Sequence, residues 1–167
     1  LTGINNRRGL DDFLVAQLAL MNRYEVGFAV AILDIDHFKH INDEQGHLEG
    51  DRILQKVAGL IDESARETDF VARYGGEEFL VICQNADFKA AVHSAERLRQ
   101  TVRALDIPVG QVLIKTSVSI GLAQKEPATA NADALVSAAD TALYAAKKHG
   151  RNCTCIIAKG KVTCGNS

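Results

Sequence analysis

The stretch "DFVARYGGEEFLVIC", Asp69–Cys83, decides the fold of this chain. Two apolar runs, each typical of a β-strand, enclose two glycines and then two glutamates, Glu77 and Glu78. Glycine adopts positive φ angles with little strain, so the sequence predicts a hairpin that turns at Gly75 and Gly76. The adjacent acids indicate either a solvated turn or a tip with a chemical role.

Further strands and helices lie on both sides of this hairpin. Before it, "EVGFAVAILDID" contains the uncharged run Val26–Leu33, which suits a strand buried on both faces. After it, "LIKTSVSIGLA", Leu113–Ala123, predicts another strand, and "CTCIIA", Cys153–Ala158, predicts a closing strand. The spacing of apolar residues predicts four helices, near Leu10–Met21, Gly46–Ser64, Phe88–Leu105 and Leu135–Ala146, the last closed by Gly150.

The order strand, helix, hairpin, helix and strand is that of the split βαβ, or ferredoxin-like, arrangement. We therefore expect an α+β palm domain with a central, mainly antiparallel sheet and helices packed around it. Because the hairpin strands flank or join the central strand, the end of "AILDID" and the hairpin tip lie side by side. This places Asp34 near Glu77.

Composition limits the class of protein. The 167 residues, 47% of them apolar, suffice for one core, and the net charge of -2 excludes a generally basic, nucleic-acid-binding surface. No apolar run approaches the roughly 20 residues that span a bilayer, and the start does not resemble a signal peptide. We therefore expect a cytoplasmic domain, whose full-length protein can still be membrane-anchored upstream.

The ends of the chain give three expectations. Because the chain opens inside a motif at Leu1, we expect a regulatory domain that precedes residue 1. We expect a domain over residues 1–157 and a disordered tail over 158–167, since "KGKVTCGNS" lacks periodicity. The spacing of the four cysteines, Cys83, Cys153, Cys155 and Cys164, matches no usual zinc site, so we expect reduced thiols.

Two carboxylates at the edge of an apolar sheet repel each other and lose hydration unless a cation lies between them. Asp34 and Glu77 therefore form a plausible half-site for Mg²⁺, which binds one or two carboxylates together with phosphate oxygens and water. The alternative is a solvated hairpin tip, with Asp34 capping the next helix. Spacing alone does not separate the two.

The turn "DIDHFKHIND" and the following "EQGHLEGD" add polar groups that suit a nucleotide. Lys39 can neutralise phosphate, and free backbone amides near a helix start bind anions. Asn42, His47 and Asp51 can bind the edge of a base, and an aspartate can accept two hydrogen bonds from guanine. Alternatively, Asn42 and Asp51 are helix caps.

The segment "AKKHGRN" carries Lys147 and Arg151, four residues apart across a helix end. Both can face one triphosphate. Equally, cations at this position neutralise the last carbonyls and the negative end of the helix dipole.

Taken together, these segments resemble a GGDEF domain of the diguanylate cyclase family, with "GGEEF" as a variant of its signature. The resemblance rests on "LTGINNRR", "DIDHFKHIND", "GHLEGD", "RYGGEEF", "SVSIGLA" and "ADTALYAAKKHGRN" in this order, over about the first 155 residues. It implies an enzyme that condenses two GTP molecules into cyclic di-GMP and releases pyrophosphate. The active site is then assembled between two domains, as a homodimer that can be transient.

The resemblance also implies roles for single residues. Mg²⁺, or alternatively Mn²⁺, is bound by Asp34, the carbonyl of Ile35 and Glu77. Glu77 helps to deprotonate the attacking 3′-hydroxyl, and Lys39 stabilises charge on the phosphates. The remaining substrate-binding residues are Phe38, Asn42, His47 and Asp51 around guanine and ribose, and Lys147 and Arg151 at the terminal phosphates.

A product-inhibition site is implied by "RETD", Arg66–Asp69, which occupies the place of the family's RxxD motif. Arginine can pair bidentately with the acceptor edge of guanine, and aspartate accepts from its donors. Arg97 matches a position that completes this site. The alternative is a surface ion pair.

Two other functions are compatible with paired acids on such a fold. One is a catalytically silent receptor that binds GTP or cyclic di-GMP, which the loss of signature acids would favour, and none is missing here. The other is a nucleic acid polymerase palm, against which the short chain and the lack of a basic channel argue.

Overall fold

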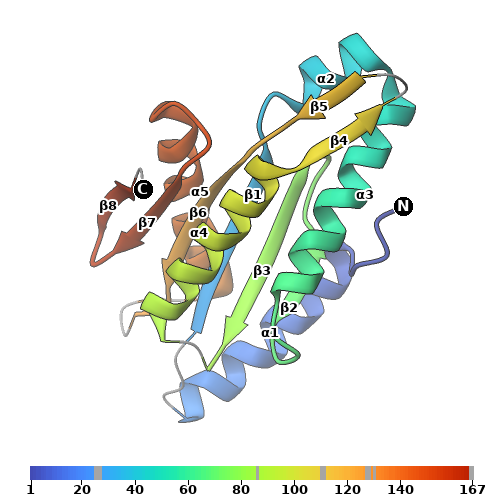
Figure 1. Ribbon diagram of the computed structural model, residues 1–167. Helices are drawn as coiled ribbons and strands as arrows, with labels where there is room; N and C mark the ends of the chain where they lie inside the picture. Colours follow the sequence, from blue (N-terminus) through green and yellow to red (C-terminus); the bar gives the residue numbers. More distant parts are fainter. Residues whose placement is uncertain (25–27, 86, 110–111, 127–128, 130, 166–167) are drawn as a thin grey trace.

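The computed structural model describes residues 1–24, 28–85, 87–109, 112–126, 129 and 131–165 (Figure 1). The helices are α1 (Arg7–Tyr24), α2 (Phe38–Gln45), α3 (His47–Ser64), α4 (Phe88–Ala104) and α5 (Ala132–Lys148). The strands are β1 (Phe28–Ile35), β2 (Phe70–Arg73), β3 (Glu78–Gln84), β4 (Asp106–Val109), β5 (Val112–Lys115), β6 (Val118–Gln124), β7 (Thr154–Ala158) and β8 (Lys161–Gly165).

The main sheet confirms the predicted fold class. Its strand order is β2-β3-β1-β6-β7-β8, and β1 pairs antiparallel with both β3 and β6. The first four strands form the split βαβ arrangement, and β7 extends the sheet as the predicted closing strand, parallel to β6. The register places Asp34, near the end of β1, opposite Glu78 of β3 and Ser119 of β6.

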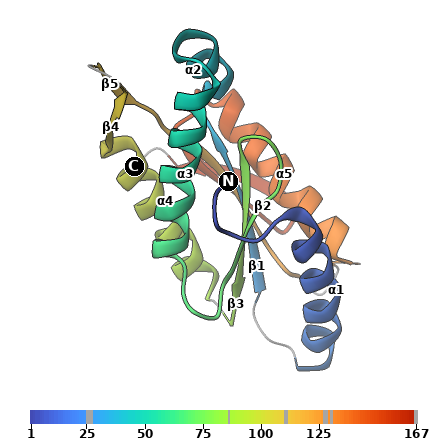
Figure 2. The ribbon, with the colours of Figure 1, turned by 90° about the vertical axis from the view of Figure 1, so that its right-hand side faces the viewer.

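Helices cover both faces of the sheet, α3 and α4 on one and α1 and α5 on the other (Figure 2). Every residue of β1 is buried, as its unbroken apolar run predicts. Alternate side chains of the strand enter different clusters: Ala31 and Leu33 pack with the α3 and α4 side, and Val30 and Ile32 with the α1 and α5 side. The central strand is thereby fixed, and with it the position of Asp34.

Helix α5 lies unusually close to β6, at Gly121. A Cβ added to Gly121 would lie 2.1 Å from the amide nitrogen of Leu143 and 2.3 Å from the carbonyl oxygen of Ala139. Such distances exclude any side chain at this position. The contact brings the end of α5, with Lys147, to the end of β1.

Two segments differ from the sequence prediction in secondary structure. The segment expected as a turn after β1 contains a separate helix, α2, which begins after His37 in the left-handed conformation (φ 58°). The strand expected over Leu113–Ala123 is interrupted at Thr116–Ser117, so that β5 pairs with β4 in a separate hairpin. Ile107 and Val109 of β4 are buried in the core, which holds this hairpin on the domain.

The expectation of a disordered tail over 158–167 is wrong for Lys161–Gly165, which forms β8 and pairs with β7. Lys159 and Gly160 both have positive φ angles (50° and 70°), as a two-residue hairpin turn requires. Val162 and Cys164 then pack against buried residues of α5 and β7. Two alternating apolar residues, Val162 and Cys164, were too few to show this periodicity in the sequence.

The cysteines also differ in part from the prediction. Cys155 and Cys164 are directly opposite each other in β7 and β8 and form a disulfide, so the expectation of reduced thiols is wrong for this pair. Cys83 and Cys153 are free thiols. In the described part of the chain, no helix is both long enough and apolar enough to cross a membrane.

Candidate functional site

One cleft brings together most of the predicted catalytic and substrate-binding residues. It has a volume of about 490 Å³ and lies between α2, α3 and the hairpin tip. Its lining consists of Phe38, Lys39, Asn42, Asp43, His47, Asp51, Leu54, Arg73, Gly76 and Glu77. Six of these were predicted from the sequence as catalytic or substrate-binding residues: Phe38, Lys39, Asn42, His47, Asp51 and Glu77. The first and the last of them are 39 positions apart in the sequence.

The hairpin tip is held in place by backbone groups and one cation. The amide of Ile35 donates to the carbonyl oxygen of Glu77 at 3.3 Å, which attaches the tip to the end of β1. The guanidinium of Arg73 donates to the carbonyl oxygens of Gly75 (3.2 Å) and Gly76 (3.0 and 2.6 Å). Sequence reasoning missed Arg73, although a cation two residues before a pair of glycines is a recognisable signal.

Asp34 is a buried carboxylate that needs a positive partner. Its side chain accepts a hydrogen bond from the ammonium of Lys147 at 2.7 Å. Burial raises the pKa of Asp34 above its ordinary value of 3.8, Lys147 lowers it in part, and the nearby Glu77 and Glu78 raise it again. The juxtaposition of Asp34 with Glu77 that the fold class predicted is therefore present.

The residues here fit a divalent cation with a preference for oxygen. Asp34, Glu77 and the carbonyl of Ile35 are hard oxygen donors, and Mg²⁺ usually completes such a partial set with phosphate oxygens and water. The excess of negative charge around Asp34 favours a cation in the same place. Within the described residues, no group of three or more His, Cys, Asp or Glu side chains forms a metal site of its own.

The helix-cap interpretations are not supported by the helix boundaries. Asn42 lies inside α2 and Asp51 inside α3, whereas Gly46 precedes α3 as its N-cap. The N-cap of α2 is His37 and not Asp34. The side chains of Asp34, Asn42 and Asp51 therefore cap neither α2 nor α3.

Asn42 has an unsatisfied acceptor at the cleft. Its Oδ1 atom is buried and has no hydrogen-bond partner among the described residues. The absence of a side chain at Gly50 makes room for it, since a Cβ there would lie 1.8 Å from Oδ1. An amide that is both confined and unpaired is suited to a donor on a ligand.

The two cations of "AKKHGRN" that were predicted to bind phosphate, Lys147 and Arg151, lie at the same end of the sheet. Lys147, in the last turn of α5, is half-buried against Asp34, and Arg151 is exposed on the turn after Gly150. Gly150 has a φ of 111°, and the amide of Arg151 donates to the carbonyl oxygen of Ala146 at 3.0 Å, which closes the helix. Gly150 thus ends the helix as predicted.

Asp36 is a further acid that the sequence analysis did not select. It is 3% exposed and accepts hydrogen bonds from the hydroxyls of Ser117 and Ser119 (2.6 Å each) and the amide of Asn152 (3.0 Å). Its position two residues after Asp34 was the available signal. Unlike Asp34, it is surrounded by hydrogen-bond donors.

The predicted product-inhibition residues lie apart from the cleft lining. The amide of Arg66 donates to Oδ2 of Asp69 at 3.0 Å, and the amide of Asp69 donates to the carbonyl oxygen of Arg66 at 2.9 Å. In the described structure Arg66 and Asp69 therefore meet through the backbone of Arg66 and not as a side-chain ion pair. Oδ1 of Asp69 is buried without a partner, in a small cavity that also contains Cys83 and Ser94 of α4.

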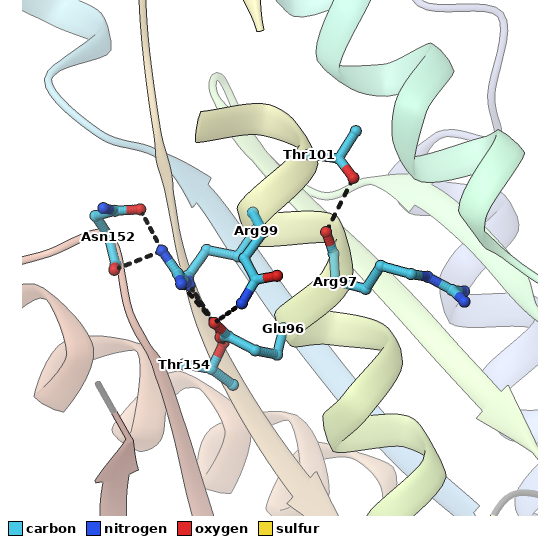
Figure 3. Close-up of polar contacts among 7 residues, drawn as sticks. Glu96, Arg97, Arg99, Thr101, Asn152 and Thr154 are labelled. Carbon is cyan, nitrogen blue, oxygen red and sulfur yellow. Dashed lines mark hydrogen bonds and ion pairs between the residues drawn. The ribbon is translucent and has the colours of Figure 1, made fainter. Parts of the chain in front are cut away.

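Arg97 lies one turn beyond Ser94 on α4. Its side chain is exposed and points away from the Glu96 and Arg99 cluster on the same helix (Figure 3). Burial, and next the carboxylate of Asp69, raise the pKa of Cys83 to about 12. The environment of Cys83 is therefore apolar and negatively charged, with the guanidinium of Arg66 as the opposing charge.

Comparison with known proteins identifies the family. Residues 1–153 match the family described as "Diguanylate cyclase, GGDEF domain", and the chain belongs to this family. The diguanylate cyclase DgcP of Pseudomonas aeruginosa is 39% identical over 152 residues, which cover 91% of this chain and 22% of that protein. The chain therefore spans about a fifth of the length of this relative.

Two solved structures share the fold. The coiled coil and GGDEF domain of DgcB from Caulobacter crescentus, in complex with c-di-GMP, has a TM-score of 0.89 at 32% identity and covers 93% of this chain and 83% of that chain. The active GGEEF domain of a diguanylate cyclase from Vibrio cholerae has a TM-score of 0.86 at 32% identity, and the match covers 93% of this chain and 99% of that chain. The predicted palm-like fold is thus confirmed.

Proposed function

We propose that this domain is a diguanylate cyclase, which condenses two GTP molecules into cyclic di-GMP. In the reaction, each 3′-hydroxyl oxygen attacks the α-phosphorus of the other GTP, so that two phosphodiester bonds form and two pyrophosphates leave. The observation that carries the proposal is the single cleft lined by Lys39, Asn42, His47, Asp51 and Glu77, next to the buried Asp34. Relatives named diguanylate cyclases support it.

Base recognition falls to the α2 and α3 side of the cleft. The unpaired Oδ1 of Asn42 and the carboxylate of Asp51 accept from the donors of guanine, which adenine lacks in that arrangement. His47 and Phe38 complete the guanine and ribose pocket. GTP is therefore the preferred nucleotide.

Charge neutralisation falls to the hairpin side of the cleft. Asp34, the carbonyl of Ile35 and Glu77 would hold Mg²⁺, or Mn²⁺ in its place, which supplies charge neutralisation at the phosphates when bound. Glu77 accepts the proton of the attacking hydroxyl at its carboxylate. Lys39 places its ammonium at the phosphates and stabilises the charge that develops there.

Lys147 and Arg151 hold the terminal phosphates. In the described structure Lys147 pairs with Asp34, so its ammonium already lies where phosphate oxygens and a cation would meet. Were the charge of Asp34 neutralised by a bound cation instead, the ammonium of Lys147 would be free to bind the phosphates.

Each domain binds one GTP in this cleft, so the reaction requires a second copy of the domain, in a homodimer that can be transient. A regulatory module preceding the domain controls this encounter. Feedback is provided by cyclic di-GMP at Arg66, Asp69 and Arg97, away from the cleft.

Incubation of the purified domain with GTP and Mg²⁺ at several protein concentrations, followed by separation of the nucleotides, tests the proposal. We expect cyclic di-GMP, with a specific activity that rises with protein concentration. Glu77→Gln should abolish product formation and leave the fold intact, because Glu77 is partly exposed at the hairpin turn and belongs to no core cluster. Glu63→Gln, on the exposed end of α3, is the matched control and should retain full activity.

Two results would contradict the proposal. Full activity of Glu77→Gln would refute the role of this carboxylate. Binding of GTP without formation of cyclic di-GMP at any protein concentration would favour the catalytically silent receptor.

A further inference from the structure

A chain of buried polar groups runs from the end of β1 to α4, outside the cleft. The amide of Asn152 donates to Asp36 at 3.0 Å, and Nη1 of Arg99 donates to the carbonyl oxygen (3.1 Å) and to Oδ1 (2.7 Å) of the same Asn152. Arg99 is bound in turn to Glu96, which accepts from the hydroxyl of Thr154 at 3.0 Å (Figure 3). Three polar groups of Asn152 take part in this chain: its backbone amide, its carbonyl oxygen and its Oδ1 atom.

The segment that these bonds hold has an unusual backbone. Gly150, Arg151 and Asn152 have successive φ angles of 111°, 66° and 45°. Glycine tolerates such angles, but two consecutive residues with side chains in the left-handed region are uncommon and persist only where the surroundings fix them. Asp36 and Arg99 fix this segment from two sides, through Asn152.

The burial of these charges shows that the contact is a specific one. Asp36 is 3% exposed and Arg99 is 7% exposed, and a buried charge is tolerated only where it is paired or hydrogen-bonded. Asp36 receives three hydrogen bonds and Arg99 is paired with Glu96. Arg99 therefore has its charge satisfied on its own helix, and its bonds to Asn152 serve the turn.

We propose that Asp36 and Arg99 are positioning residues, which hold the Gly150–Asn152 turn so that Arg151 faces the nucleotide phosphates beside Asp34. Asp34 and Asp36 lie on either side of Ile35, so one strand end anchors both the metal-binding acid and the phosphate-binding turn. The inference rests on the proposed function, since it gives Arg151 the phosphate role.

A positioning role and a structural role can be told apart by the part of the nucleotide whose binding is weakened. If Arg99 acts through Arg151, its loss weakens contacts to the terminal phosphates and leaves the base and ribose contacts unchanged. The probes are 3′-deoxy-GTP, which lacks the attacking hydroxyl and cannot react, and GMP, which lacks the terminal phosphates. Calorimetry with Mg²⁺ gives both affinities on the same protein.

The variants are Arg99→Met, Arg151→Ala and the double variant, with Arg103→Met as the control on the same helix. Arg103 is exposed in the last turn of α4. We expect Arg99→Met to weaken 3′-deoxy-GTP binding about tenfold, as for the loss of one hydrogen bond to a charged group, and GMP binding less than about twofold. In the Arg151→Ala background, Arg99→Met should have no further effect, and Arg103→Met should resemble the wild type.

A second variant covers the case in which Arg99→Met does not fold. Asn152→Gly retains the left-handed backbone and removes Oδ1, the nearer of the two acceptors that Arg99 contacts, and we expect a selective loss of 3′-deoxy-GTP affinity of the same kind. Equal losses for 3′-deoxy-GTP and GMP, or full additivity with Arg151→Ala, would overturn the positioning role. If Arg151→Ala weakens 3′-deoxy-GTP and neither Arg99→Met nor Asn152→Gly does, only this inference fails; if the wild type binds no guanine nucleotide, the proposed function fails with it.

Discussion

Asp34 and Lys147 are 113 positions apart in the sequence, yet Nζ of Lys147 lies 2.7 Å from Oδ2 of Asp34. The pair connects the central strand β1 to the last helix, α5, at the end of the sheet where the cleft opens. Asp34 is nearly buried and Lys147 is about one third exposed, with side-chain exposures of 10% and 31%. The lysine can therefore leave the pair for water or phosphate at lower cost than the aspartate can.

The first prediction concerns stability and pH. Burial, only partly offset by Lys147, raises the pKa of Asp34 in the folded state above 3.8, so ionised Asp34 destabilises the fold relative to the unfolded chain. This penalty is absent well below pH 3.8 and is complete above the folded-state pKa. Asp34→Asn should therefore raise the melting temperature at pH 7 without divalent cations, and this gain should disappear as the pH falls toward 3.

The same variant reports on cation binding. Mg²⁺ should raise the melting temperature of the wild type, because a ligand that binds only the folded state stabilises it, and should not affect Asp34→Asn. Thermal melts with and without Mg²⁺ measure both effects. A melting temperature of Asp34→Asn below that of the wild type at pH 7 would show that the Lys147 pair outweighs burial.

The second prediction concerns Lys39, which lines the cleft and is exposed. If its ammonium meets charge that develops in the transition state, Lys39→Ala should lower kcat by about 10²–10³-fold and change KM much less. Lys56→Ala, which removes an exposed cation from α3 outside the cleft lining, is the control. Steady-state kinetics with GTP separate the two parameters, and an unchanged kcat would remove the catalytic role.

The third prediction concerns the space beside Asn42. Gly50→Ala would place a methyl group within 1.8 Å of Oδ1 of Asn42 and force the amide to move. We expect weaker GTP binding and reduced discrimination between GTP and ATP, by about 1–3 kcal/mol if one base contact is lost. Calorimetry with both nucleotides measures this difference.

The control for this variant lies on the same helix. At Gly59 an added Cβ meets no atom within 4 Å, so Gly59→Ala should stabilise α3 by roughly 0.5–1 kcal/mol and leave nucleotide affinity unchanged. If Gly50→Ala binds GTP as Gly59→Ala does, Asn42 is not a base contact.

The fourth prediction concerns feedback. Cyclic di-GMP should inhibit without competing with GTP, since Arg66 and Asp69 lie outside the cleft lining. Arg66→Ala and Arg97→Ala should each weaken cyclic di-GMP binding by about 1–3 kcal/mol, the range for one bidentate contact to guanine, and should spare most of the catalysis. Calorimetry with cyclic di-GMP tests this: equal affinity in the wild type and both variants would exclude a product site here.

The fifth prediction concerns the cysteines. Under non-reducing, denaturing conditions two thiols per chain should react with a thiol reagent, and four after reduction, because Cys155 and Cys164 are bonded. Reduction should lower the free energy of unfolding by roughly 2–3 kcal/mol, since the bond closes a short loop. In the native protein Cys83 should react slowly at neutral pH, because its pKa is about 12. Four reactive thiols without a reductant would contradict the disulfide.

The sequence predicted the parts of the fold that long patterns encode. The uncharged run Val26–Leu33 identified β1, and the glycine pair identified the hairpin and thereby the approach of Glu77 to Asp34. The β4 hairpin and β8 could not be predicted in this way, because β4 and β8 are four and five residues long and each packs only two side chains against the core.

For the site, residue types that suit a nucleotide identified Lys39, Asn42 and Asp51, whereas residues that act through other residues were missed. Asp36 and Arg99 both bind Asn152, which lies 116 positions from Asp36 and 53 positions from Arg99 in the sequence. No local pattern encodes such a bond. Arg73 differs, since its bonds to Gly75 and Gly76 are local and were accessible from the sequence.

The close approach at Gly121 has a consequence for how this domain tolerates change. Since the backbones of β6 and α5 touch there, no side chain can adjust to absorb a substitution, and even alanine would move the helix outward as a rigid rod. The displacement would be transmitted along the helix to Lys147, four residues beyond Leu143. The missing methyl group at Gly121 thus determines where α5 lies and how far Lys147 extends toward Asp34. Selection for nucleotide binding would therefore act on a position that no nucleotide contacts.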